Sequence, residues 1–101
     1  MMMIVFRSRL RDDAGADYGE TAEAMLARAR SMPGFVSFKQ YKADDGERLS
    51  LIHWESAETL TAWAEDAAHR DAHRRGRERW YSTYAIEVAE VVRTSVFPRG
   101  A

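Results

Sequence analysis

The stretch that decides the fold is residues 49–81, which read LSLIHWESAETLTAWAEDAAHRDAHRRGRERWY. Its beginning is mostly an alternating apolar pattern, which predicts a strand, and at Ser56 the pattern changes to that of a helix. The segment holds all three tryptophans and two of the three histidines, namely Trp54, Trp63, Trp80, His69 and His73. We therefore expect the side chains of any functional site to come mainly from this segment.

A strand and a helix are predicted near the start of the chain. Residues 2–10 begin with an apolar run, and because side chains alternate between the faces of a strand, Phe6 and Ser8 share one face. In the helix that follows, Asp17 is the expected N-cap, and Glu20 lies three positions later as in a capping box. Both side chains would then satisfy backbone N–H groups of the first turn.

The remaining elements are separated by turn signals. Pro-Gly at 33–34 ends the first helix, and Asp-Gly at 45–46 predicts a hairpin. The elements expected are strands over residues 35–42, 47–55 and 84–97, and a helix capped by Ser56 that bends or breaks at 66–68 and continues through His69 and His73 towards Arg79.

The order β-α-β-β-α(α)-β predicts a ferredoxin-like α+β fold, a four-stranded antiparallel sheet with its helices on one face. The first strand is also apolar on its other face, at Met3 and Val5, and so is the last strand, at Ala89 and Val91. A water-exposed face would alternate more cleanly. We therefore expect a homodimer in which two sheets form a dimeric α/β barrel, with the long last strand reaching towards the partner.

The composition is that of one globular domain spanning residues 1–101, with a core over about 3–93 and a C-terminal extension over 94–101. A net charge of −1 gives no reason to expect a nucleic-acid or membrane partner. The chain has no cysteine, which excludes disulfides, thiol nucleophiles and cysteine-bound metals. Residues 1–6 resemble neither a signal peptide nor a span, so a cytoplasmic location is expected.

Trp63 has two interpretations, because a helix tryptophan is most often part of the core but also makes a flat wall for an aromatic ligand. Phe6, Phe38 and Trp54 lie on strands and are candidates for further walls of such a pocket. An aromatic-rich region with few polar groups is typical of a small-molecule site.

His69 and His73 are four residues apart and share one face of a helix. No third ligand is evident, so we expect no metal site. Three interpretations stay open: solvated surface histidines, a general base or hydrogen-bond donor, and an axial ligand to haem iron. The neighbouring arginines Arg70, Arg74 and Arg77 are interpreted as a solvated face or as a grip on an anionic group.

The chain resembles the antibiotic biosynthesis monooxygenase (ABM) domain family of the dimeric α/β-barrel superfamily. The resemblance covers residues 3 to about 93 and depends on the order and spacing of short pieces, none diagnostic alone. These are the opening strand at 3–10, Met-Pro-Gly-Phe at 32–35, Trp-Glu-Ser at 54–56, Leu-Thr-Ala-Trp at 60–63, His-Arg at 69–70, Gly-Arg-Glu at 76–78, and the last strand at 88–92.

The resemblance implies oxidation of an aromatic quinol-like or polyketide-like molecule by O2, without metal, flavin or haem. In such a reaction the substrate itself supplies the electrons, and the protein deprotonates it, orients it and excludes water. Trp63 would be the substrate wall and His73 or His69 the base or hydrogen-bond partner. Ser8 and Tyr81 would be further substrate-binding residues.

A second branch of the superfamily, which degrades haem, is also resembled. That branch has a tryptophan on this helix and an iron-binding histidine ten positions later, the spacing of Trp63 and His73. It also has an asparagine on the first strand, where this chain has Ser8. Haem cleavage with His73 as axial ligand is therefore the alternative, and a non-catalytic dimeric binding module is the third hypothesis.

Overall fold

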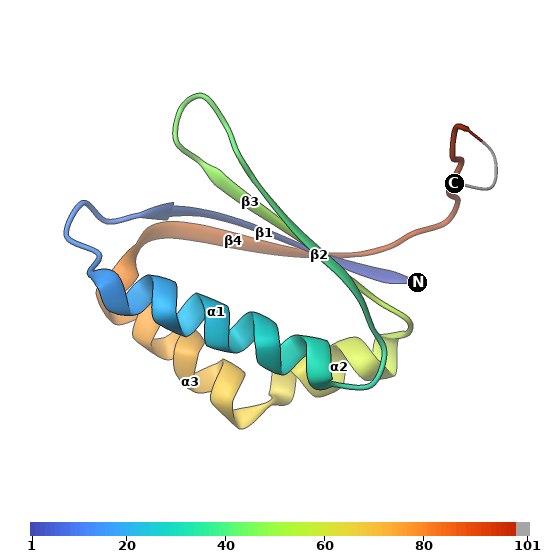
Figure 1. Cartoon of the computed structure of the whole chain (residues 1–101), viewed down its shortest axis with the longest axis horizontal. Coiled ribbons are helices and arrows are strands. Elements are labelled where there is room, and N and C mark those ends of the chain that lie inside the picture. The colour runs from blue at the N-terminus through green and yellow to red at the C-terminus, as the bar shows by residue number, and fades with distance from the viewer. Residues whose placement is uncertain (99–101) are drawn as a thin grey trace.

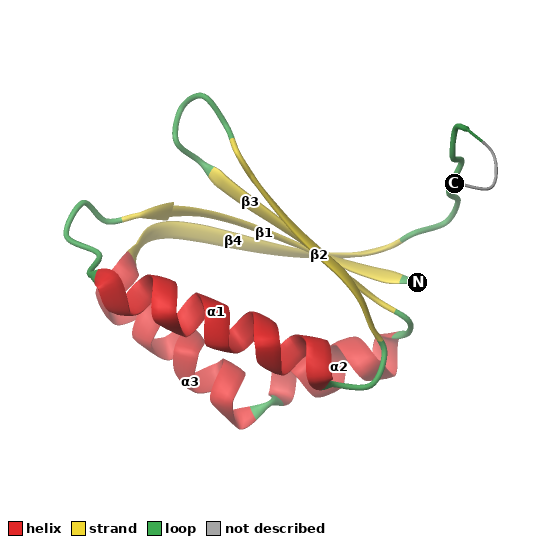
Figure 2. Ribbon diagram, in the orientation of Figure 1, coloured by secondary structure: helices red, strands yellow, loops and turns green. Residues whose placement is uncertain are grey.

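The computed structural model describes residues 1–98 and shows a four-stranded antiparallel sheet with every helix on one face (Figures 1 and 2). The strands lie in the order β2-β3-β1-β4, which confirms the ferredoxin-like α+β prediction. The elements are β1 (Met2–Leu10), α1 (Ala16–Ser31), β2 (Phe35–Lys42), β3 (Arg48–Trp54), α2 (Ala57–Glu65), α3 (Ala67–Arg75), the π-helical segment η1 (Gly76–Trp80) and β4 (Tyr81–Glu90). No helix within residues 1–98 has the length and hydropathy that crossing a membrane requires.

The core lies between the sheet and the helices at the end where α2 begins. Trp54 of β3 is fully buried, and its ring stacks on Trp63 of α2 at a centroid distance of 6.0 Å. Phe35 meets the edge of Trp54 at 5.7 Å. Ile4 and Leu60 complete the buried cluster with Ala29. This aromatic stack fixes α2 against β3 and thereby positions Trp63.

The break between α2 and α3 lies at Asp66, inside the predicted interval. Ser56 begins α2 with a capping box in which its hydroxyl accepts a hydrogen bond from the N–H of Thr59. The carboxylate of Asp66 accepts the N–H of His69 at 3.0 Å and an ion pair from Arg28 of α1 at 2.7 Å. The hydrogen bonds from Arg28 and from the His69 N–H lower the pKa of Asp66 to about 2. The carboxylate is therefore charged at pH 7, and its ion pair with Arg28 links the start of α3 to α1.

Two predicted element ends are wrong. The helix α1 begins at Ala16 after Gly15, and no side chain caps it. The carboxylate of Asp17 instead accepts a hydrogen bond from the indole N–H of Trp80 and forms an ion pair with Arg79. It is therefore engaged in tertiary contacts and does not cap the helix. The last strand runs over Tyr81–Glu90 and not over 84–97, and its pairing with β1 ends where Glu90 lies opposite Met2.

The sheet face opposite the helices has no covering element within residues 1–98 (Figure 1). The register places Val5 of β1 between Leu51 of β3 and Glu87 of β4 on this face. After β4 the chain extends away from the body, where Val92 and Phe97 are 92% and 96% exposed. Residues 99–101 of the predicted C-terminal extension lie outside the described residues.

Candidate active site

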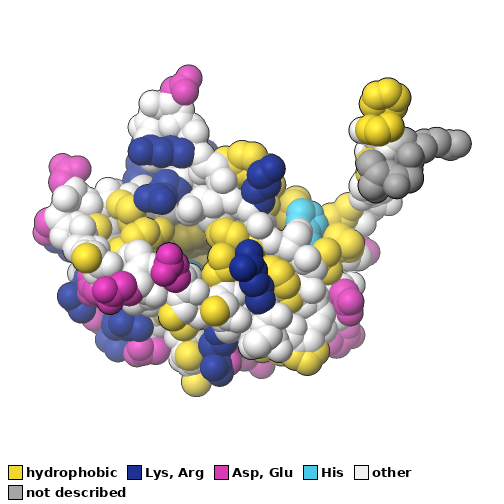
Figure 3. All heavy atoms as spheres, in the orientation of Figure 1, with side chains coloured by type: hydrophobic (Ala, Val, Ile, Leu, Met, Phe, Trp, Pro, Cys, Tyr) yellow, Lys and Arg dark blue, Asp and Glu magenta, His cyan; other side chains and the backbone are white. Residues whose placement is uncertain are grey.

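A cavity of about 420 Å³ lies between α1, α3 and the inner face of the sheet. Its volume is within the range of about 300–1,000 Å³ typical of small-molecule sites. Figure 3 shows it as a hollow with hydrophobic side chains inside and charged side chains around the opening. The lining is mainly aromatic and aliphatic, and it is contributed by β1, α1, β2, β3, α2, α3, η1 and β4.

Six of the expected site residues line this cavity and two do not. The six come from five different elements and are Phe6, Phe38, Trp63, His69, His73 and Tyr81. Trp54 is not among the described lining residues, because it is fully buried in the core behind Trp63. Ser8 is likewise absent from the lining and is only 3% exposed, so the expected role of both residues in substrate contact needs correction.

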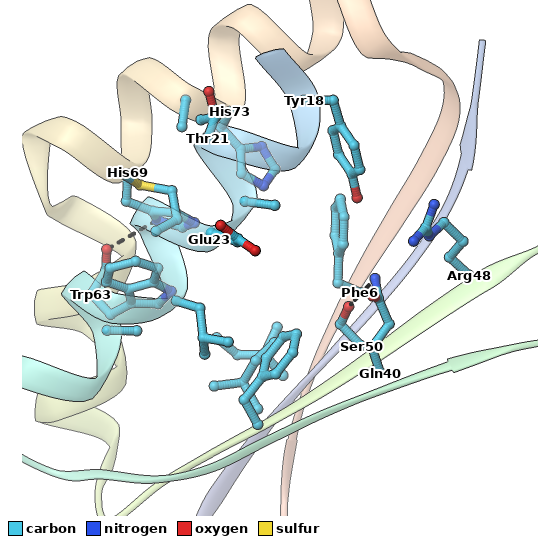
Figure 4. Close-up of a pocket in the computed structure, with 18 of the residues that line it drawn as sticks. Phe6, Tyr18, Thr21, Glu23, Gln40, Arg48, Ser50, Trp63, His69 and His73 are labelled. Atoms are coloured by element: carbon cyan, nitrogen blue, oxygen red, sulfur yellow. Dashed lines mark hydrogen bonds between the residues drawn. The ribbon is translucent and has the colours of Figure 1, made fainter. Parts of the chain in front are cut away.

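His69 is held in a defined orientation by Trp63 (Figure 4). Its ring stacks on the indole at a centroid distance of 4.1 Å, and its Nδ1 donates a hydrogen bond to the Trp63 carbonyl at 3.1 Å. This bond leaves Nε2 without a proton in the neutral ring. Burial, and then the proximity of His73, lowers the pKa of His69 to about 4. His69 is therefore neutral at pH 7, with its orientation fixed by the helix itself.

His73 lies one turn further along α3 and points into the cavity (Figure 4). Its ring meets Phe6 at 5.5 Å, Tyr84 at 5.4 Å and His69 at 5.2 Å, all edge-on. Burial first, and the charge of Arg77 second, lower its pKa. Neither ring nitrogen bonds a residue in the described part of the chain. His73 is therefore a neutral base whose nitrogens are available to a ligand.

A second, more open groove of about 560 Å³ lies on the other side of these residues. Trp63, His69 and His73 line both spaces and so form a partition between them. The arginines predicted as a stripe lie along this groove, and Arg74 pairs with Asp71 at 2.8 Å. The structure therefore favours a solvated face for this stripe.

The polar end of the cavity was missed by the sequence interpretation. It consists of Tyr18, Gln40, Arg48 and Ser50. The missed signal was the two-residue spacing along each strand. Gln40 lies two residues after Phe38, and its partner Ser50 lies two residues before Ile52, so all four side chains share the inner face. Gln40 Nε2 donates a hydrogen bond to Ser50 Oγ at 3.4 Å. A polar pair at inward positions of two apolar strands indicates a ligand contact.

Replacing Gly76 by Ala is expected to lower the free energy of unfolding by about 1–3 kcal/mol, since overpacking strains a filled interior. A Cβ at Gly76 would lie 2.5 Å from Cε2 of Tyr81, whose ring is held by Phe6 and Tyr18. Urea denaturation measures the loss. Gly19→Ala is the matched control: its Cβ would meet nothing within 4 Å, so a gain of about 0.5–1 kcal/mol is expected. Equal stability of the two variants would contradict this packing.

The cavity contains titratable groups but no metal cluster. Within residues 1–98, no group of three or more His, Cys, Asp or Glu side chains is arranged to hold a metal ion. The residues brought together are two neutral histidines, a tryptophan wall and a polar end with one arginine. Chemically, this arrangement can bind an aromatic molecule, accept a proton from it and limit its contact with water.

Comparison with known proteins agrees with this fold. The family model for antibiotic biosynthesis monooxygenases matches residues 1–75, so the chain belongs to the ABM family. It is 33% identical over 93 residues to the uncharacterized protein YqjZ of Bacillus subtilis. The aligned region covers 92% of this chain and 82% of YqjZ.

Two solved structures share the fold at low sequence identity. One is Rv0793 of Mycobacterium tuberculosis, with a TM-score of 0.80, 19% identity, and coverage of 94% of this chain and 98% of that one. The other is SnoaB of Streptomyces nogalater, described as a cofactor-independent oxygenase, with a TM-score of 0.75, 15% identity, and coverage of 92% and 94%. These similarities establish the ferredoxin-like fold of the ABM family.

Proposed function

We propose that this single-domain protein is a monooxygenase that oxidises an aromatic quinol-like or polyketide-like molecule with O2 and needs no cofactor. The observation that carries the proposal is the position of His73, a neutral base with free ring nitrogens in an apolar, aromatic cavity. Membership of the ABM family and the fold shared with a cofactor-independent oxygenase support it.

The proposed reaction begins with proton transfer from the substrate to His73. Trp63 provides a flat wall against which an aromatic ring stacks, and the buried cavity strengthens the hydrogen bond to the developing anion. The electron-rich anion then reduces O2. One oxygen atom enters the product at the oxidised ring carbon, and the other leaves as water with the protons removed from the substrate.

The experiment is an oxygen-electrode assay with a panel of anthrones and naphthoquinols, followed by mass analysis of products formed under ¹⁸O2. The proposal expects O2 uptake that saturates with one panel member and a single ¹⁸O atom in the product. Uptake at the uncatalysed rate with every member, together with failure of any member to bind, would contradict the proposed function. Binding of a panel member without uptake above the uncatalysed rate would instead favour the non-catalytic binding module.

Haem fits the site less well. An axial ligand needs open space at its free nitrogen for a large planar macrocycle. Here three aromatic rings surround the His73 ring at centroid distances of 5.5 Å or less. They belong to Phe6 of β1, His69 of α3 and Tyr84 of β4. The cofactor-free oxygenase therefore remains the better proposal.

We also propose that two copies of the chain pack sheet to sheet, covering the face that carries Val5 and Leu51. Val5→Asp is expected to convert the dimer into a monomer, since it buries a second carboxylate beside Glu87 in the contact between the sheets. Light scattering would show the mass halved. Ala24→Asp adds the same charge on the exposed surface of α1 and should leave the mass unchanged. A wild-type protein of monomer mass would contradict the proposal.

A further inference from the structure

The two ends of the cavity differ in charge. At one end His69, His73 and Trp63 are neutral at pH 7. At the other end the half-buried guanidinium of Arg48 lies 5.7 Å from the centre of the Tyr18 ring. Figure 4 shows Arg48 pointing from β3 towards Tyr18 and Phe6. The cavity thus carries a fixed positive charge at one end only.

Arg48 has no ion-pair partner among the residues that the structure describes, although it is half-buried. Seven other arginines each pair with an Asp or Glu; they are Arg7, Arg9, Arg11, Arg28, Arg74, Arg75 and Arg79. The other described arginines without such a pair are exposed to solvent. Arg48 is the one of the described set that is half-buried, unpaired and part of a cavity wall. A charge in this environment is stabilised by a counter-ion.

The groups around Arg48 can donate hydrogen bonds but carry no negative charge. Gln40 and Ser50 are neutral, and burial together with the Tyr18 hydroxyl raises the pKa of Tyr81, which keeps that phenol protonated. Glu23 of α1 is the one carboxylate among the described lining residues, and it lies beyond ion-pair distance of Arg48. An anionic ligand would therefore meet a cation and several donors at this end.

We propose that Arg48 binds a carboxylate on the aromatic substrate, which makes an aromatic carboxylic acid the substrate class. This inference rests on the proposed function and adds an orientation to it. The planar guanidinium matches both oxygens of a carboxylate. With the carboxylate at Arg48, the ring system extends past Phe6 towards Trp63, and the opposite edge of the substrate reaches His73. Arg48 thereby selects which edge of the molecule is oxidised.

The test is isothermal titration calorimetry of the full chain with two probes, anthraquinone-2-carboxylate and its uncharged analogue anthraquinone-2-carboxamide. The wild type is expected to bind the carboxylate about 10-fold more tightly or better, as befits a charge-assisted hydrogen bond. Arg48→Gln should reduce this preference to less than about 2-fold while carboxamide binding is retained, and Arg48→Lys should restore part of it. Arg30→Gln, on the exposed surface of α1, is the matched control and should keep the full preference.

The outcomes separate the two proposals. Equal binding of both probes to the wild type, or a carboxylate preference that survives in Arg48→Gln, would overturn the inference while leaving the aromatic pocket intact. Binding of neither probe would overturn the inference and the proposed function together. Thermal melts of each variant ensure that a loss of binding is not a loss of fold. Raising the salt concentration should weaken only carboxylate binding if Arg48 is responsible.

Discussion

His73→Ala is expected to lower the kcat of quinol oxidation about 100-fold or more, the usual contribution of a positioned general base. The ring of His73 lies in the cavity wall with its nitrogens free, so alanine removes the proton acceptor and leaves the other walls in place. Oxygen uptake under saturating substrate measures the effect. His53→Ala is the matched control, because His53 lies on the opposite sheet face beside Ser37.

The pH profile gives this prediction a second measurement. The base must be unprotonated to act, and burial lowers the pKa of His73 below the ordinary value of about 6.5. Activity should therefore persist as the pH falls through 6.5 and be lost only at lower pH, with apparent values that belong to the coupled His69–His73 pair. A fall in kcat/KM centred at 6.5 or above would contradict this assignment.

The same variant decides between the oxygenase and the haem alternative. Hemin is titrated into wild type and His73→Ala, and the Soret band is followed. We expect no saturating, one-per-subunit shift that depends on His73. Such a shift in the wild type, abolished by the substitution, would instead assign His73 as an axial ligand.

Trp63→Ala is expected to reduce the free energy of unfolding by about 3–5 kcal/mol, the cost of emptying a buried aromatic position. Trp63 is 6% exposed and stacks on both Trp54 and His69. Denaturant unfolding measures the loss. Trp63→Phe retains an aromatic ring and should lose less than half as much. Unfolding of Trp63→Ala at the wild-type denaturant concentration would contradict the packing of Trp63 between Trp54 and His69.

The same variant distinguishes the role of Trp63 as a wall of the cavity from its role in the packing of the core. Below its melting temperature the variant should still lose substrate affinity, because the ring that faces the cavity is gone. Trp63→Phe should keep most of the affinity. If binding were unchanged in a folded Trp63→Ala protein, Trp63 would be a core residue alone.

Local signals predicted most of the fold, because strand alternation and the Ser56 cap depend on neighbouring residues. The two errors arose where distant residues decide. Asp17 has the sequence of a cap, but Arg79 and Trp80 take its carboxylate from more than sixty residues away. The end of β4 lies opposite the end of β1, and no pattern within β4 itself shows this.

The site was predicted less completely than the fold. Trp63, His69 and His73 were identified because their residue types stand out within one segment. Arg48 was missed because an arginine at the start of a strand normally points to solvent. Its place in the cavity wall depends on how β2 pairs with β3, which only the three-dimensional structure shows.

The distribution of indole rings gives this protein a built-in optical reporter. Trp63 and Trp80 line the cavity, and Trp54 stacks on Trp63, so no tryptophan is remote from the site. Ultraviolet emission of the unlabelled chain thus arises from the site and from the ring directly behind it. A ligand stacked on Trp63 changes that emission without any contribution from a distant indole to dilute the signal.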